Sequence, residues 1–538
     1  CCISCEMTLS QYETFELPGD VPKRGTKTKI AASFVALCAI ASVSLSVWTI
    51  TTRSPTPSPA PEGGGRCFPK GFFWGVATGA YQVEGGWNAT GREMSIWDQF
   101  CRSKTDIACA DVADDEIELY KDDIALMASM GVNAYRFSIS WSRVMSWNST
   151  SKRMVANREG LQYYHDVIAE LRKHFIAPLI TLYHWDLPQA LEDSLDPPGW
   201  LNAAIQEHFV DFSRLCFSEF GRVVPFWLTL NEPWTFSTLG YSVGAHAPGR
   251  SGNPNEVYRV AHNALLSHAK AVATFRQMRS AGQVMLGARI SLVVNSDIGI
   301  PHDEAASDDV AAADRYNQFQ IGWFLQPLLT GSYPAVMQQY AKQHLPTFSE
   351  QEQQLVMGSY DNVIGLNHYT THLVTDCASP RSTVNCSDLP VGWAADLAVD
   401  SNPHPPGAVP SGTTDGQPNC PWHAGYPAGY KLLLRWVHGK MRGADILLTE
   451  NGWCGNNTVD DEGQLWYYKT YTQQVHEALE EGVPVIGYTA WSLLDNYEWG
   501  SYQPRFGLVQ VDYDTQVRTP KVAADYYHRL VTTSCLPS

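Results

Sequence analysis

The stretch "PFWLTLNEPW", residues 225–234, places a carboxylic acid directly after a run of apolar residues. Phe226, Leu228 and Leu230 alternate with Trp227 and Thr229 in the pattern of a buried β-strand. Glu232 follows this run after a single residue. A second stretch, "ADILLTENGW" at 444–453, repeats this arrangement with Glu450. An acid in such a place either ends a core strand without a purpose or faces a site at the strand's end.

Eight strand-like runs alternate with helical patterns after residue 66. The strand-like runs lie at 72–77, 134–141, 177–183, 226–230, 285–294, 363–367, 445–448 and 483–489. Apolar residues with helical spacing occur near 115–130, 159–174, 203–220, 256–280, 310–327, 464–481 and 518–531. This alternation predicts an α/β fold, a (β/α)8 TIM barrel formed by one large domain at 67–538. A doubly wound open sheet is the alternative, but "GVATGAYQVEGG" after the first run lacks its glycine order.

The barrel gives the two glutamates a purpose. In a (β/α)8 barrel the C-terminal ends of the strands form the face that carries the active site. Glu232 and Glu450, each at the end of a strand-like run, are therefore expected on the same face. Two carboxyl groups on one face are what glycoside hydrolysis requires, one as proton donor and one as nucleophile or base. The alternative is that either residue is an ordinary loop or helix-capping acid.

Composition and charge exclude other classes of function. The chain has 538 residues, a formal net charge of −17 and no long run of like charge, so a nucleic-acid partner is not expected. No H-E-x-x-H motif and no cluster of Cys and His at metal-ligand spacing occurs, so no metal site is predicted either. Nothing in the sequence indicates an oligomeric state.

The N-terminal region differs in composition from the rest. Residues 30–50 carry no charge and are long enough to cross a bilayer as a helix. Lysine and arginine crowd the preceding tail, 1–29, which predicts a cytosolic tail, a signal-anchor helix and an outward-facing main body, a single-pass type II arrangement. Residues 51–66 form a linker rich in Pro, Ser and Gly. A cleaved signal peptide followed by secretion, or a buried core helix, are the alternatives.

Sequons and cysteines also predict an outward-facing domain in an oxidising compartment. Four N-glycosylation sequons follow the hydrophobic run, at Asn88, Asn148, Asn385 and Asn456. Several cysteines are spaced as if paired across short loops, Cys101 with Cys109 and Cys377 with Cys386. Cys67 and Cys535 flank the domain and are placed to join its ends, whereas Cys216 lies in a helical pattern and is expected to be a buried free thiol.

Several motifs together resemble one known family. "FFWGVATGAYQVEGG", "YRFSISWSRV", "LYHWDLPQAL", "TLNEPW", "GLNHYT", "LLTENGW" and "AWSLLDNYEW" are similar, in this order, to the signatures of glycoside hydrolase family 1, the β-glucosidase family. The resemblance extends from about residue 68 to 531. It implies a retaining β-glycosidase that acts on small-molecule or oligosaccharide β-glycosides without a cofactor.

The resemblance also implies roles for particular residues. Glu232 would be the acid/base and Glu450 the nucleophile, with Arg136 and Tyr369 in contact with that nucleophile. The positions that match the family's sugar-binding residues are Gln82, His184, Asn231, Trp491, Glu498 and Trp499. Amide, imidazole and carboxylate groups suit sugar hydroxyls, and an indole face suits the apolar face of a sugar ring.

Comparison with the family's branches narrows the expected substrate. Relatives that cleave phosphorylated sugars carry phosphate-binding Ser and Lys where this chain has Glu498 and Trp499, so an unphosphorylated sugar is expected. Plant thioglucosidases have Gln in place of the acid/base, whereas Glu232 is present here and favours O-glycosides. Glucose is the expected sugar, with galactose or fucose as alternatives. Klotho-like relatives lose a catalytic acid, so the competing function is a non-catalytic glycan- or protein-binding module on the same fold.

Overall fold

The structure, a computed structural model, describes residues 66–414 and 416–537. The predicted cytosolic tail at 1–29, the predicted membrane helix at 30–50 and nearly all of the predicted linker at 51–66 lie outside the described residues. Across the two described ranges, no helix combines the length and the apolar character that crossing a membrane needs.

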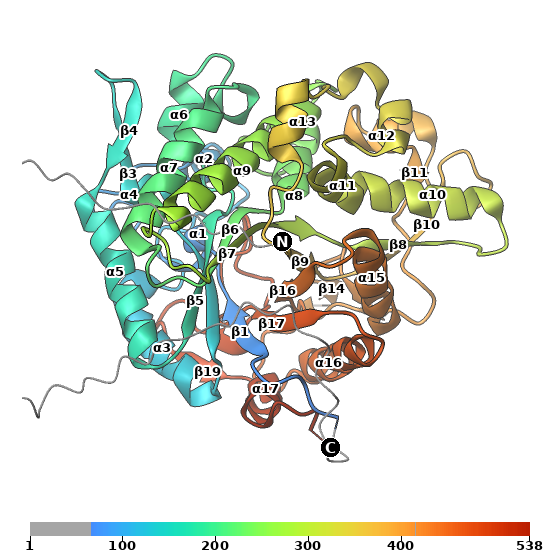
Figure 1. The fold of residues 1–538 in the computed structure, drawn as a ribbon. Coiled ribbons are helices and arrows are strands. Elements are labelled where there is room, and N and C mark those ends of the chain that lie inside the picture. The colour runs from blue at the N-terminus through green and yellow to red at the C-terminus, as the bar shows by residue number, and fades with distance from the viewer. Residues whose placement is uncertain (1–65, 415, 538) are drawn as a thin grey trace, which may run out of the picture. The chain divides into compact units, whose positions relative to one another are not determined.

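Eight parallel strands close into a barrel at the centre of the domain (Figure 1). Their order around the barrel is β1, β17, β16, β9, β7, β6, β5, β2, and each pairs in parallel with both neighbours. The strands are β1 (Phe73–Ala77), β2 (Ala134–Ser138), β5 (Ala177–Tyr183), β6 (Phe226–Asn231), β7 (Arg289–Asn295), β9 (Val363–His368), β16 (Asp445–Asn451) and β17 (Val485–Trp491). This arrangement confirms the predicted (β/α)8 barrel.

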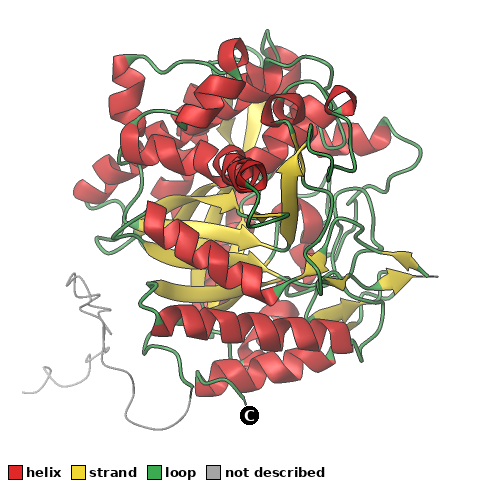
Figure 2. Cartoon of the chain, turned by 90° about the vertical axis from the view of Figure 1, so that its right-hand side faces the viewer, coloured by secondary structure: helices red, strands yellow, loops and turns green. Residues whose placement is uncertain are grey.

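Helices surround the barrel, so that the strands occupy the interior and the helices the outside (Figure 2). The longer helices are α3 (Glu116–Met130), α5 (Arg158–Lys173), α7 (Ile205–Phe220), α9 (Glu256–Ser280), α10 (Ser307–Asn317), α11 (Trp323–Thr330), α15 (Pro427–Lys440), α16 (Glu462–Glu480) and α17 (Val522–Thr533). Helix α15 was not predicted from the sequence. Its buried residues Tyr430, Leu433, Leu434 and Val437 have helical spacing, but two glycines weaken the helical pattern.

The structure moves the ends of several predicted strands. Strand β2 ends at Ser138, before the predicted end at 141, because Trp141 begins the short helix α4 (Trp141–Val144). Strand β7 begins at Arg289 and not at 285. Strands β6 and β16 are longer than predicted, so Glu450 lies inside β16, whereas Glu232 directly follows β6. A shift in the β16–β9 register next to Glu450 lets the strand continue past it.

The remaining elements are loops, short helices and small sheets. The short helices are α1 (Ala80–Val83), α2 (Ile96–Arg102), α6 (Gln189–Ser194), α8 (Pro233–Thr238), α12 (Ala335–Tyr340), α13 (Glu350–Val356) and α14 (Trp393–Leu397). The short strands are β3 (Met145–Asn148), β4 (Arg153–Ala156), β8 (Ile298–Pro301), β10 (Thr371–Asp376), β11 (Val399–Asp400), β12 (Val409–Pro410), β13 (Thr413–Thr414), β14 (Gln417–Pro418), β15 (Ala424–Gly425), β18 (Val509–Val511) and β19 (Arg518–Pro520). Most of them lie in the connections between barrel strands and the helices that follow.

Four disulfides cross-link the described residues. Three are the pairs that the sequence suggested, Cys67–Cys535, Cys101–Cys109 and Cys377–Cys386. The fourth, Cys420–Cys454, was not predicted, since its cysteines are 34 residues apart and belong to different loops. Cys216 is a buried free thiol in α7, as expected. A disulfide-rich domain fits an oxidising compartment.

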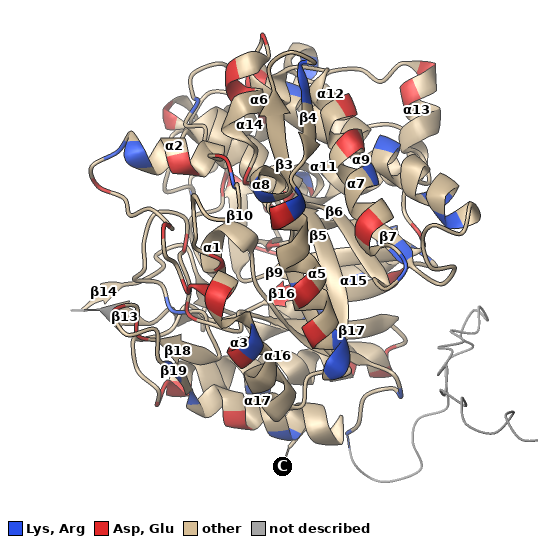
Figure 3. Ribbon diagram, turned by 90° about the vertical axis from the view of Figure 1, so that its left-hand side faces the viewer, with Lys and Arg blue, Asp and Glu red and all other residues tan. Residues whose placement is uncertain are grey.

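Charged residues of both signs are spread over the outer helices (Figure 3). A few ion pairs are buried instead. Lys521, at the start of α17, donates to Asp495 Oδ1 at 2.7 Å, and both side chains are 0% exposed. Arg505 lies farther from the same carboxylate, with its Nη1 3.6 Å from Asp495 Oδ2. A buried charge is costly unless its partners stay in place, because the desolvation of an ion is offset only by the opposite charges near it. This pair therefore holds α17 to the loop that follows β17.

Replacing Lys521 with Met should lower the free energy of unfolding by about 3 kcal/mol, because Asp495 would keep a buried charge with only the more distant Arg505 to compensate it. The measurement is denaturant unfolding followed by far-UV circular dichroism. Arg435→Met is the matched control, since it removes a cation from the pair Arg435–Glu481 on the surface. Equal midpoints for the two variants would contradict the structural importance of the buried pair.

Candidate active site

Glu232 lies at the C-terminal end of β6, at the mouth of the barrel. Pro233 begins α8 directly after it and disfavours a helical conformation for the preceding residue. Glu232 instead takes a left-handed conformation, with φ of 46°, and its N–H donates to the carbonyl of Val293 on β7 at 2.9 Å. Non-glycine residues rarely adopt this conformation, and it turns the side chain of Glu232 away from the course of the strand.

Glu450 is buried at the C-terminal end of β16 between two supporting side chains. Arg136, on β2, donates from Nη1 to Glu450 Oε1. Tyr369, directly after β9, donates its hydroxyl proton to Glu450 Oε2 at 2.7 Å. Both carboxylate oxygens are therefore held, one by a residue of β2 and the other by the residue that follows β9. These are the two residues that the family resemblance placed next to the predicted nucleophile.

Asn367 connects the two glutamates, a contact that the sequence-based assignment did not include. Its Nδ2 donates to Glu232 Oε1 at 2.7 Å and to Asn231 Oδ1 at 3.0 Å. Asn231 Oδ1 in turn accepts from Arg136 Nη2 at 2.7 Å. A hydrogen-bonded path thus runs from Glu232 to Arg136 and on to Glu450. The signal was available, because Asn367 is a polar residue at the end of a strand, within "GLNHYT".

The two glutamates have different electrostatic surroundings. Burial raises the pKa of Glu232 to about 8, and the negative charge of Glu450 adds to this rise. Burial also raises the pKa of Glu450 above its ordinary value, but the Arg136 guanidinium and the Tyr369 hydroxyl oppose that rise. Of the two, Glu450 alone has a cation against it, so Glu450 is the one to carry the charge while Glu232 holds a proton.

Gln82 and His184 each have one buried hydrogen-bonding atom without a partner among the described residues. Gln82 Nε2 donates to Asn496 Oδ1 and to the carbonyl of Tyr497. The Oε1 atom of Gln82 has no hydrogen-bond partner among the described residues. His184 Nε2 accepts from Asn231 Nδ2 at 3.0 Å, and burial lowers the pKa of His184 well below its usual range. The ring is therefore neutral and its proton is on Nδ1, which also lacks a described partner. Together the two side chains offer one acceptor and one donor.

Two tryptophans pack next to His184, and Glu498 contacts one of them. The ring of His184 stacks on Trp491 and on Trp499, with centroids 5.8 Å and 5.9 Å apart. Trp491 Nε1 donates to Glu498 Oε1 at 3.1 Å, and burial raises the pKa of Glu498 to about 8. These contacts join His184, Asn231, Trp491, Glu498 and Trp499 in one connected group beside Glu232 and Glu450. Gln82 is hydrogen-bonded to the carbonyl of Tyr497, the residue before Glu498.

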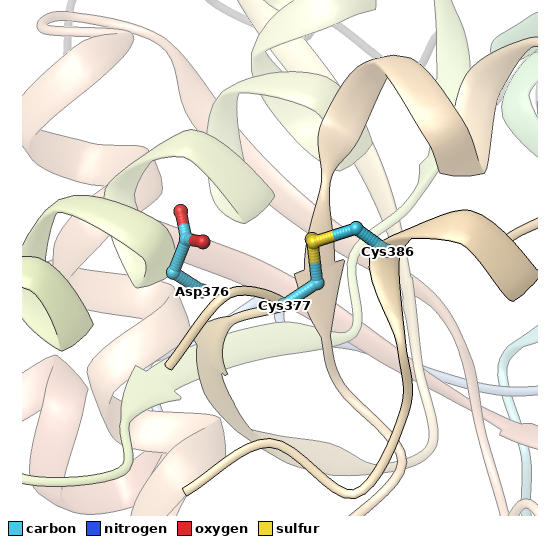
Figure 4. A group of neighbouring side chains, drawn as sticks. All are labelled: Asp376, Cys377 and Cys386. Carbon is cyan, nitrogen blue, oxygen red and sulfur yellow. A yellow bond between two sulfur atoms is a disulfide. The ribbon is translucent and has the colours of Figure 1, made fainter. Parts of the chain in front are cut away.

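One other cluster in the described residues has the composition of a metal site, but its ligand atoms are engaged elsewhere. Asp376, Cys377 and Cys386 lie close together at the end of β10 (Figure 4). The two sulfur atoms form a disulfide, and Asp376 pairs with Arg315 at 2.9 Å. A disulfide sulfur carries no thiolate charge, so this cluster does not match the chemistry of a metal centre.

Comparisons with known proteins agree with this geometry. The model of the Glycosyl hydrolase family 1 matches residues 65–535. The furostanol glycoside 26-O-β-glucosidase of Hellenia speciosa is 39% identical over 87% of this chain and 83% of its own. β-Glucosidase 42 of Arabidopsis thaliana is 37% identical over 86% of this chain and 94% of its own.

A solved rice β-glucosidase, Os3BGlu6, is similar in structure as well. The structure is that of a mutant in a covalent complex with Glc, and it superposes with a TM-score of 0.78 at 35% identity, covering 86% of this chain and 98% of that chain. The region that the family model matches includes the barrel and every predicted site residue. The chain therefore belongs to glycosyl hydrolase family 1 and is a glycoside hydrolase of the β-glucosidase type.

Proposed function

We propose that the protein hydrolyses terminal, unphosphorylated β-D-glucosides with net retention, through a covalent glycosyl-enzyme intermediate. The observation that carries the proposal is the unequal support of the two glutamates. Glu450 is paired with Arg136 and Tyr369, which favours a carboxylate. Glu232 has no cation against it and a pKa raised to about 8, which favours a carboxylic acid.

In the first step Glu450 is the nucleophile. One of its carboxylate oxygens forms a bond to the anomeric carbon, the bond from that carbon to the leaving oxygen breaks, and Glu232 gives its proton to the leaving oxygen. The product is a glycosyl ester and a free alcohol. The covalent complex with Glc reported for the rice relative supports an intermediate of this kind.

In the second step Glu232 is the base. Ester formation removes the charge of Glu450, so the pKa of Glu232 falls and its carboxylate can accept a proton from water. The oxygen of that water forms a bond to the anomeric carbon, the ester bond breaks, and the carboxylate of Glu450 is restored. Each displacement inverts the anomeric carbon, so two displacements retain its configuration.

The sugar would be bound by the group that includes Gln82, His184, Asn231, Glu498 and Trp491. The acceptor of Gln82 and the donor of His184, both without a described partner, suit two hydroxyls of one sugar. Glu498 suits a further hydroxyl, and the indole of Trp491 suits the apolar face of the ring. No phosphate-binding cation belongs to this group, which supports an unphosphorylated glucoside. We propose glucose as the preferred sugar, with β-galactosides and β-fucosides as alternative substrates.

The compartment is also a proposal. Four disulfides support an oxidising environment for the domain, either lumenal or extracellular. Of the four sequon asparagines, Asn88, Asn148 and Asn385 are exposed and Asn456 is half-buried. The predicted anchor at 30–50 stays a prediction, with secretion after signal cleavage as its alternative.

Glu450→Gln should reduce kcat for p-nitrophenyl β-glucoside by on the order of 10⁴-fold or more, because an amide does not form the glycosyl ester. Glu232→Ala should slow both steps, and azide should restore part of the second step with this activated substrate. Glu462→Gln, on the exposed first turn of α16, is the control and should match the wild type.

NMR of the first sugar released by the wild-type enzyme should show the β-anomer. Early accumulation of the α-anomer would exclude double displacement. Near wild-type activity of Glu450→Gln would exclude Glu450 as the nucleophile. Absence of turnover on every β-glycoside tested, with a sugar still bound, would favour the non-catalytic binding module.

The alkaline limb of the kcat/KM profile should report the proton on Glu232, with activity falling as the pH rises through about 8. Asn367→Ala removes a hydrogen bond that favours the ionised form of Glu232, so the pKa of Glu232 should rise and this limb should move to higher pH. Thr235→Val removes the other such bond, 2.7 Å long, and should shift the limb in the same direction. A shift to lower pH in both variants would contradict this assignment.

If residues 30–50 are an uncleaved anchor, carbonate washing should leave the native protein in the membrane fraction, since extracting a helix of about 20 apolar residues from the bilayer is unfavourable. Removal of N-glycans should lower the apparent mass through the exposed sequons. A chain that begins at Arg66 should be soluble and fully active. A soluble native protein whose mature N-terminus lies near residue 50 would replace the anchor with a cleaved signal.

A further inference from the structure

A loop at 411–425, of which all residues but 415 are described, is joined covalently to the strand end that carries Glu450. Cys454 follows Glu450 by four residues and is 0% exposed, and its partner Cys420 is 3% exposed. The loop comes from the long connection between β9 and α15. The cross-link therefore joins two segments of the chain at the mouth of the barrel.

Hydrogen bonds hold the same two segments together. Gly412 N donates to the carbonyl of Cys454 at 2.8 Å, and Asn419 Nδ2 donates to the carbonyl of Gly455 at 2.8 Å. On the loop itself, Ser411 Oγ donates to the carbonyl of Cys420 at 3.0 Å. The disulfide thus lies at the centre of a small bonded contact, and it is the only covalent part of that contact.

Two aromatic side chains of the loop pack against the ring of Tyr369. The ring of Trp422 meets the ring of Tyr369 edge to face, with centroids 5.9 Å apart, and the ring of His423 lies 6.5 Å from it. Phe506, from another loop, completes the enclosure at 5.7 Å. Both cysteines belong with Tyr369 and Phe506 to one buried apolar cluster.

The backbone of Tyr369 and its ring are held by different partners. Its N–H donates to Asp297 Oδ1 at 3.1 Å, which fixes the start of the side chain. The far end of the ring carries the hydroxyl that donates to Glu450, and the direction of the ring is set by the side chains packed around it, which include the disulfide and the aromatic residues. A small rotation of the ring would lengthen the 2.7 Å bond to Glu450.

We propose that the Cys420–Cys454 disulfide is a positioning element for the reaction, which holds the loop at 411–425 against the ring of Tyr369 and so keeps the Tyr369 hydroxyl on Glu450. The inference rests on the proposed role of Glu450 as nucleophile. The other three disulfides join the ends of the barrel domain or close short loops, and none of their cysteines belongs to the apolar cluster around Tyr369.

The test is a double-mutant cycle on the full chain. Cys420→Ser/Cys454→Ser should lower kcat about tenfold for p-nitrophenyl β-glucoside with a smaller change in KM, because misplacing a supporting group acts on the transition state. Tyr369→Phe should cost at least as much in the wild type and much less in the variant that lacks the disulfide. Cys377→Ser/Cys386→Ser is the matched control and should show the full, additive cost of Tyr369→Phe.

A second measurement separates positioning from general stability. The groups that face Glu450 are Arg136, Glu232, Tyr369 and Glu498, each from a different segment. Losing the Tyr369 hydrogen bond raises the pKa of Glu450, so the acid limb of the kcat/KM profile should move to higher pH without the disulfide. Reduced thermal stability alone would not move that limb.

His423→Leu provides an independent variant that keeps the disulfide and removes one ring from the contact with Tyr369. It should reproduce the same non-additivity with Tyr369→Phe, and it serves if the double serine variant does not fold. Additive effects in both cycles, or unchanged kcat with an unmoved acid limb, would overturn the inference. Activity in Glu450→Gln would instead overturn the proposed function on which it rests.

Discussion

The buried charge of Arg136 is the constraint on which the active-site end of the barrel depends. Its guanidinium is fully buried, where an unpaired cation would cost several kcal/mol. It finds its partners on three other strands: Thr181 on β5 through Nε at 2.9 Å, Asn231 on β6, and Glu450 on β16. Satisfying one cation therefore holds four strands in fixed relative positions and stabilises the negative charge of the predicted nucleophile.

The position of Arg136 also gives the two glutamates different protonation states. Burial disfavours charge on both, but only Glu450 touches a guanidinium, so the compensation is one-sided. Glu232 is left with neutral donors, Asn367 and Thr235, and with the field of Glu450. One acid and one carboxylate at the same mouth follow from where a single positive charge lies, which is the division of roles that a double displacement needs.

Around this centre, the loops of the C-terminal face are held by covalent and aromatic contacts. Tyr369 supplies the second support of Glu450, yet its ring is oriented by residues from the loop at 411–425 and by Phe506. The Cys420–Cys454 bridge joins that loop to the end of β16. The bridge and the aromatic contacts thereby restrain irregular segments that are far apart in the chain, as backbone hydrogen bonds restrain the strands.

The sequence by itself determined the barrel and the positions of Glu232 and Glu450, because apolar periodicity and acids at strand ends are local patterns. The family motifs extended this to Arg136, Tyr369 and the sugar-binding residues. Tertiary structure alone decided what joins strands distant in the chain: the bridging role of Asn367, the extension of β16 past Glu450, and the Cys420–Cys454 pair. These depend on distances and register across the barrel, which no window of neighbouring residues encodes.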